Sequence, residues 1–231
     1  MALVLPGSAG TAMAQTNLVQ NGNFSSLLVN ASDQFGSLYP TQQVTGWSTG
    51  GYNFVFLPGT ADTTGATGAS GNVKLWGPND GSSNGLTAAS PTGGNYIAAD
   101  GAYEVSAITQ TINGLNVGQN VTVSFSWAGA QQSGFTGATS DYWTVSLGTV
   151  SASNPSQTTS TVNLASKGFS GWMSQTFTFV ATSSSELLSF LATGTPSGQP
   201  PFALLANVSV TNVPEPAAWT VMVSGLVGLI G

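Results

Sequence analysis

The sequence lacks cysteine, histidine and arginine, and its only basic side chains are Lys74 and Lys167. Without cysteine there can be no disulfide, thiolate nucleophile or zinc–cysteine site. Without histidine the chain lacks the residue that most often acts as a general base or a transition-metal ligand. No catalytic activity can be read from the remaining residues, and we predict that the protein is not an enzyme.

Charge is scarce as well. Charged residues make up 4% of the 231 residues, and the net charge is −6, whereas about a quarter of an ordinary globular protein is charged. Nucleic acids and anionic lipids are bound through Lys and Arg, so neither is expected as a partner. Low charge also occurs in disordered chains, but 41% hydrophobic and 10% aromatic residues with a mean hydropathy of +0.17 favour a packed core.

The body of the chain alternates apolar and polar residues in short runs separated by Gly, Asn, Pro and Ser. The clearest runs are 121–127, 143–147 and 174–180, and a period of two predicts strands with one buried face. Weaker strands are expected at 52–56, 73–76, 95–99, 105–112, 187–192 and 203–210. The polar stretch 59–72 is expected to form a long surface loop.

Many short strands without helical periodicity predict an all-β fold, an antiparallel two-sheet sandwich of the jelly-roll type. The strand phase predicts that one set of side chains is buried in its core: Phe125, Trp127, Trp143, Val145, Leu147, Phe177, Phe179 and Phe190. A single-residue slip would reverse the two faces.

The two ends of the chain differ from this body. Residues 1–14 resemble the end of a secretory signal that begins upstream, with Ala12-Met13-Ala14 as a cleavage site and Gln15 as the first mature residue. Residues 214–231 begin with Pro214-Glu215-Pro216 and continue as a short apolar segment that we expect to be helical. Fifteen apolar residues are fewer than the roughly 20 that span a bilayer, so we expect the natural chain to continue. The sandwich domain is assigned to 15–213.

The C-terminal sequence "VPEPAAWTVMVSGLVGLIG" resembles a PEP-CTERM sorting signal, although the usual Arg-rich end is absent. The body, with "NLVQNGNFS", "DYWTVSLG" and "GWMSQTFTFV", is similar to PEP-CTERM surface proteins with a galactose-binding-like jelly roll. The resemblance implies export in a Gram-negative bacterium, with signal peptidase and an exosortase as transient partners. It also implies transient anchoring in the inner membrane, followed by placement at the cell surface or in the exopolysaccharide matrix.

Relatives of this fold often hold a structural calcium ion with one acid near the first strand and one in the last. The matching positions here are Ser25 and Asn207, and neither is charged. Calcium prefers several oxygen ligands that include carboxylates. We therefore predict no cofactor, with weak calcium binding through backbone oxygens as the alternative.

Aromatic and acidic residues gather in two turn-like segments, "LWGPNDG" at 75–81 and "DGAYE" at 100–104. A sugar site needs a flat aromatic face and hydrogen-bond acceptors, which makes Trp76, Asp80, Asp100 and Tyr103 the candidate glycan-binding residues. In the alternative interpretation the two rings cover the ends of the sandwich, and the two Asp residues cap turns, as Asp-Gly pairs do.

These observations lead to a structural or adhesive surface protein with weak glycan contact. One competing function is a polysaccharide-active enzyme that uses Asp100 and Glu104 as its pair of acids. A minor alternative is ice binding by Thr rows, because Thr176 and Thr178 alternate along one strand. Thr is also favoured on any half-exposed strand, and the sequence contains no regular repeat.

Overall fold

The computed structural model describes residues 15–213 of the chain. The predictions for residues 1–14 and 214–231, including cleavage after Ala14, the Pro214-Glu215-Pro216 motif and a helical tail, lie outside the described residues. Within 15–213 the chain forms strands and no helix, so this part contains no helix that could cross a membrane.

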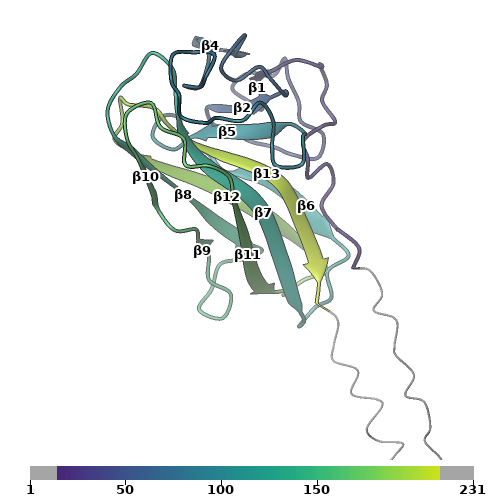
Figure 1. The fold of residues 1–231 in the computed structure, drawn as a ribbon. Coiled ribbons are helices and arrows are strands. Elements are labelled where there is room, and N and C mark those ends of the chain that lie inside the picture. Colours follow the sequence, from purple (N-terminus) through teal and green to yellow (C-terminus); the bar gives the residue numbers. More distant parts are fainter. Residues whose placement is uncertain (1–14, 214–231) are drawn as a thin grey trace, which may run out of the picture.

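Thirteen strands make up the described domain (Figure 1). In chain order they are β1 Asp33–Gln34, β2 Asn53–Phe56, β3 Ala66–Gly68, β4 Gly71–Val73, β5 Tyr96–Asp100, β6 Ile108–Asn113, β7 Asn120–Gln131, β8 Thr139–Leu147, β9 Gln157–Thr158, β10 Val162–Leu164, β11 Met173–Val180, β12 Ser185–Thr195 and β13 Pro201–Asn212.

The strands form two sheets packed face to face. The larger sheet has the order β11-β7-β13-β5-β2-β1-β3-β4, and the smaller has the order β10-β8-β12-β6 with β9 paired to β8. All neighbouring strands run antiparallel except β1 and β3, which are parallel. The predicted all-β antiparallel sandwich of the jelly-roll type is confirmed. Most predicted strands have slightly different bounds. Residues 105–107 lie outside any strand, and β6 begins at Ile108. The predicted strand at 73–76 is wrong beyond Val73, which is the last residue of β4.

The space between the sheets holds the main core, and all eight predicted core side chains are buried there. Phe190 of β12 lies at its centre, with ring centroids 5.1 Å from Phe125, 6.1 Å from Trp143 and 6.3 Å from Trp47. The indole Nε1 of Trp143 donates to the Leu204 carbonyl at 3.1 Å, which satisfies the only polar atom of that buried side chain. The alternation therefore identified the correct face of each clear strand.

A second core covers the outer face of the larger sheet at one end of the sandwich. Here β2, β5 and β13 present apolar side chains outward, and segments from the 57–95 region close over them. The prediction of a surface loop at 59–72 is wrong, because this segment contains Ala61 and Ala66 of the second core and forms the β3–β4 hairpin. The segment has few apolar residues among many Gly and Thr, so the sequence showed no clear alternation of apolar and polar positions.

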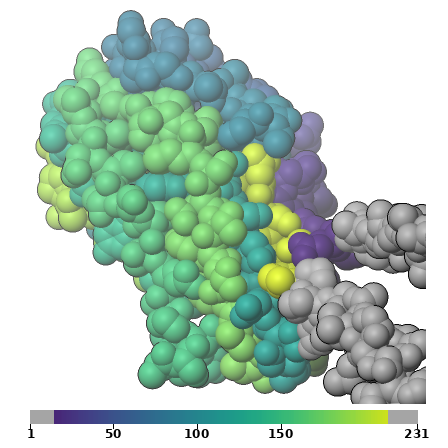
Figure 2. Space-filling view, turned by 60° about the horizontal axis from the view of Figure 1, so that its bottom comes forward, coloured from purple at the N-terminus to yellow at the C-terminus, as the bar shows by residue number. Residues whose placement is uncertain are grey.

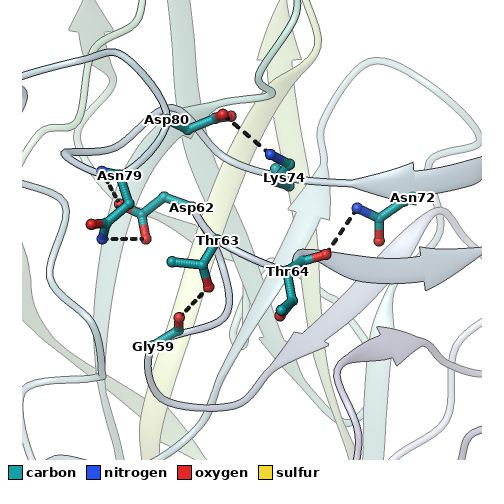
Figure 3. A network of polar contacts seen from close by, with 8 residues as sticks. All are labelled: Gly59, Asp62, Thr63, Thr64, Asn72, Lys74, Asn79 and Asp80. Atoms are coloured by element: carbon teal, nitrogen blue, oxygen red, sulfur yellow. Dashed lines mark hydrogen bonds and ion pairs between the residues drawn. The ribbon is translucent and has the colours of Figure 1, made fainter.

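Polar side chains hold these covering segments together (Figure 3). The buried Asp62 carboxylate accepts hydrogen bonds from the Asn79 backbone at 2.9 Å and from the Asn79 side chain. Asn72 donates its amide to the Thr64 carbonyl at 3.0 Å. In a chain with so few charges, amide and hydroxyl groups supply most of these links.

The first and last described segments lie side by side. The Leu18 backbone N–H donates to the Val210 carbonyl at 2.8 Å, so residues after Gln15 follow the edge of β13. Figure 2 shows the purple N-terminal segment against the yellow β13. Residues 15 and 213 therefore leave the domain from the same region.

Candidate functional site

Two of the four predicted glycan-binding residues, Asp100 and Tyr103, line a common cavity of about 350 Å³. The cavity lies where the second core meets the loop after β5, the loop after β7 and the turn before β13. Its other lining residues are Tyr52, Ser70, Gln132, Phe135, Gly198 and Pro200. We call these eight residues the Tyr103 cavity. Trp76 and Asp80 do not line it.

Asp100 supplies the carboxylate of the Tyr103 cavity. It is the last residue of β5, and the side chain is only 2% exposed. Its Oδ1 accepts hydrogen bonds from the backbone N–H groups of Ala102 at 2.8 Å and Tyr103 at 3.0 Å. The turn-capping role considered from the sequence is therefore correct, but it uses one oxygen only. Burial raises the pKa of the carboxyl to about 6, against the opposing effect of the two backbone hydrogen bonds.

Aromatic rings form the walls of the cavity. Tyr103 is 50% exposed and its ring meets that of Tyr52 edge-on, with centroids 5.2 Å apart and an interplanar angle of 86°. Phe135 is 38% exposed and lines the cavity from the loop after β7. Sequence reasoning missed Tyr52 and Phe135. Phe135 did carry a signal, because a large aromatic residue in the loop "SGFTG" has no strand face in which to be buried.

Trp76 and Asp80 have structural roles instead. The Nζ of Lys167 lies 4.1 Å from the centroid of the Trp76 ring, which occupies one face of the indole. The Trp76 Nε1 donates to the Phe135 carbonyl at 2.7 Å. Trp76 thus holds in place the loop that carries Phe135, although it does not line the cavity itself.

Asp80 forms an ion pair with Lys74, with 3.2 Å between Oδ1 and Nζ (Figure 3). Burial opposes ionisation of this carboxyl, but hydrogen bonds from Ser133 and Lys74 and the Lys74 charge outweigh burial and lower its pKa. Trp76 and Asp80 do not line the Tyr103 cavity, and their glycan-binding role stays an untested prediction.

The acid pair considered for glycoside hydrolysis is not brought together in the cavity. Asp100 lines the cavity, but Glu104 is exposed, has φ of 42° and is not among the lining residues. Catalysis of this type requires both carboxyl groups to flank one glycosidic bond. The geometry gives no support to that mechanism.

The residues at the calcium position of related folds are bonded to other side chains. The Ser25 hydroxyl donates to Asn23 Oδ1 at 3.0 Å, and Asn207 Oδ1 accepts from the Thr92 hydroxyl. Nowhere in residues 15–213 do three acidic, His or Cys side chains gather closely enough to hold a metal. The donor set at Ser25 and Asn207 does not fit calcium, which prefers carboxylates.

Strand register creates hydroxyl rows that the sequence did not reveal. Thr176 and Thr178 lie on the outer face of β11 beside β7 and β13, and each begins a row across the three strands. The rows are Thr178–Thr122–Thr211 and Thr176–Ser124–Ser209. The patch spans only two rows and three strands, and ice binding stays an untested prediction.

Comparisons with known proteins identify a fold but no family. No protein family matches the chain, and no curated protein is similar to it. Among solved structures, the Stig cyclase Fisc from Fischerella sp. TAU, in complex with (3Z)-3-(1-methyl-2-pyrrolidinylidene)-3H-indole, is 15% identical with a TM-score of 0.51. That match covers 88% of this chain and all of the cyclase. At this identity it supports a shared fold only.

Two further matches are carbohydrate-binding modules. A structure described as CBM4 is 18% identical with a TM-score of 0.39, covering 84% of this chain and 99% of that one. The module TmCBM61, solved with β-1,4-galactotriose, is 13% identical with a TM-score of 0.42, covering 86% and 99%. The function of this chain has to be argued from its own cavity.

Proposed function

We propose that the protein is an exported, non-catalytic surface or matrix protein whose Tyr103 cavity binds a short stretch of glycan. The observation that carries this proposal is the combination of exposed aromatic faces with hydrogen-bonding groups in one cavity. Tyr103 and Phe135 offer ring faces to the C–H face of a sugar. Asp100, Gln132 and Ser70 offer groups for its hydroxyls.

The size and polarity of the cavity fit this role. A volume of about 350 Å³ lies at the lower end of ordinary small-molecule sites, so it suits a few sugar units better than a long polymer. The exposed part of the larger sheet's outer face, on β11, β7 and β13, is rich in Ser and Thr and poor in charge, which suits a protein placed in a hydrated neutral matrix.

A glycan array with the purified protein tests the proposal. Tyr103→Leu and Phe135→Leu should each weaken binding of the best glycan by about tenfold, because stacking and packing contributions of about 1 kcal/mol or more are lost. Tyr142→Leu is the matched control, since Tyr142 lies on β8 of the other sheet and does not line the cavity. Unchanged binding in both cavity variants would exclude the cavity as the glycan site.

A further inference from the structure

The Tyr103 cavity combines aromatic rings with a carboxylate, and this combination favours a positively charged ligand. Three aromatic residues line it, and two of their rings, Tyr52 and Tyr103, stand at right angles with centroids 5.2 Å apart. The face of an aromatic ring carries partial negative charge and attracts cations. Tyr103 and Phe135 are both partly exposed and come from different loops, so a ligand cation can contact aromatic rings on more than one side.

The carboxylate in the cavity has an unused oxygen. Both backbone hydrogen bonds to Asp100 go to Oδ1, and Oδ2 accepts none from the described residues. The side chain is nevertheless 98% buried, and it lines the cavity. Oδ2 is therefore available to a ligand that enters the cavity, whereas Oδ1 is already bonded.

No cation of the protein neutralises this carboxylate. The chain has two lysines and no arginine or histidine, Lys74 is paired with Asp80 at 3.2 Å, and Lys167 lies over the Trp76 ring. The other charged neighbours are acids, since Glu104 follows in the same loop and Asp141, on the smaller sheet, interacts unfavourably with Asp100. The carboxylates therefore make the cavity electrostatically unfavourable for anionic ligands such as uronic acids and sulfated sugars.

We infer that the Tyr103 cavity recognises a protonated amine, and that the glycan it binds therefore carries free amino groups, as a de-N-acetylated amino-sugar polymer does. This inference rests on the proposed function of the same cavity and names the chemistry of its ligand. The ammonium group lies against the Tyr52, Tyr103 and Phe135 rings and donates a hydrogen bond to Asp100 Oδ2. An N-acetylated or neutral sugar brings no charge to the buried carboxylate.

Titration calorimetry at pH 7 with the full chain, using glucosamine oligomers and N-acetylglucosamine oligomers of equal length, tests the inference. We expect the glucosamine oligomers to bind at least about tenfold more tightly, because the charged amine gains a hydrogen bond to a carboxylate and cation–π contacts that the acetamide group lacks. Asp100→Asn should remove this preference. An Asn side chain can still accept both backbone hydrogen bonds through its oxygen, so the turn after β5 is expected to survive.

Tetramethylammonium, a quaternary ammonium probe, keeps its charge at every pH. Any pH dependence of its binding therefore reports protonation of the protein. The titratable groups that line the site are Asp100, Tyr52 and Tyr103. Glu104 and Asp141 lie outside the lining but interact electrostatically with Tyr52 and Asp100, respectively. Of these, Asp100 has a pKa of about 6, so binding of the probe should weaken as the pH falls from 8 to 5. Tyr103→Phe should keep binding and Tyr103→Leu should lose it, with thermal melts confirming that both variants are folded.

The outcomes distinguish this inference from the proposed function. Equal binding of both oligomers, unaffected by Asp100→Asn, would overturn amine recognition and leave the glycan site standing. Binding of tetramethylammonium without binding of any glycan would support amine recognition and overturn the glycan proposal. If neither the oligomers nor the probe bind, amine recognition is overturned, and the glycan array decides the proposed function separately.

Discussion

The two most deeply buried acids of the sandwich should make the protein more stable in mild acid than at neutral pH. Asp141 of β8 is fully buried, and neither of its carboxylate oxygens has a hydrogen-bond partner. Burial, and then the charge of Asp100, raise its pKa well above 3.8. Asp100 has a pKa raised by burial to about 6. In both groups the folded state favours the neutral form.

The sign of the effect follows from linkage between folding and protonation. A carboxyl group whose pKa is higher in the folded state contributes stability that is present below the unfolded value and lost as the pH rises through the folded value. For Asp100 the window runs from 3.8 to about 6. A shift of about 2 units corresponds to about 3 kcal/mol, so the free energy of unfolding should be about 2–3 kcal/mol higher at pH 4.5 than at pH 8, and Asp141 adds to this.

Urea unfolding at pH 4.5, 6 and 8 measures this difference, provided that the dependence on urea concentration stays constant. Asp100→Asn should raise stability at pH 8 and flatten the profile, since an amide has no charge to bury. The lowered pKa of Asp80 acts in the opposite direction only near and below pH 4. Falling stability between pH 8 and pH 4.5, or parallel profiles for wild type and Asp100→Asn, would refute the reasoning.

Two further predictions concern the core and the chain end. Phe177→Ala should lower the free energy of unfolding by about 3–5 kcal/mol, because Phe177 is 7% exposed and its ring centroid lies 5.8 Å from that of Phe125. Thr178→Ala on the exposed face is the control. A loss below about 1 kcal/mol for Phe177→Ala in urea unfolding would contradict the burial of this side chain. Deleting residues 214–231 should leave the melting temperature unchanged but alter retention and release in a host with an exosortase, so unchanged localisation in cell fractions would overturn the sorting role.

The alternation of short apolar runs determined the fold class and the buried faces. Phe177 and Phe179 are separated by Thr178, and such a period can bury one face of a strand only when it packs against another sheet. The alternation is a local property of each strand, so it can be recognised without knowing the partner strand. The 59–72 segment escaped prediction because its small residues carry a weak pattern, and its burial depends on an outer face of the sheet that other strands supply.

Sequence reasoning also selected two of the eight residues that line the Tyr103 cavity. Asp100 and Tyr103 stand close together in the chain, so an acid and an aromatic residue in one turn were visible without a structure. Tyr52 and Phe135 come from distant segments, and only the pairing of β2 with β5 and the loop after β7 bring them to the same cavity.

Trp76 is the opposite case, because it was predicted as a glycan-binding residue but does not line the cavity. Its sequence neighbours suggested a sugar platform, but the residues that decide its role are Lys167, which covers its ring, and Phe135, whose carbonyl accepts its N–H. The sequence by itself determined which residues of the clearly alternating strands face inward, because that depends on the period of two along each strand. Only the tertiary structure decided which loops share a cavity and which charges are already paired, because those contacts join residues far apart in the chain.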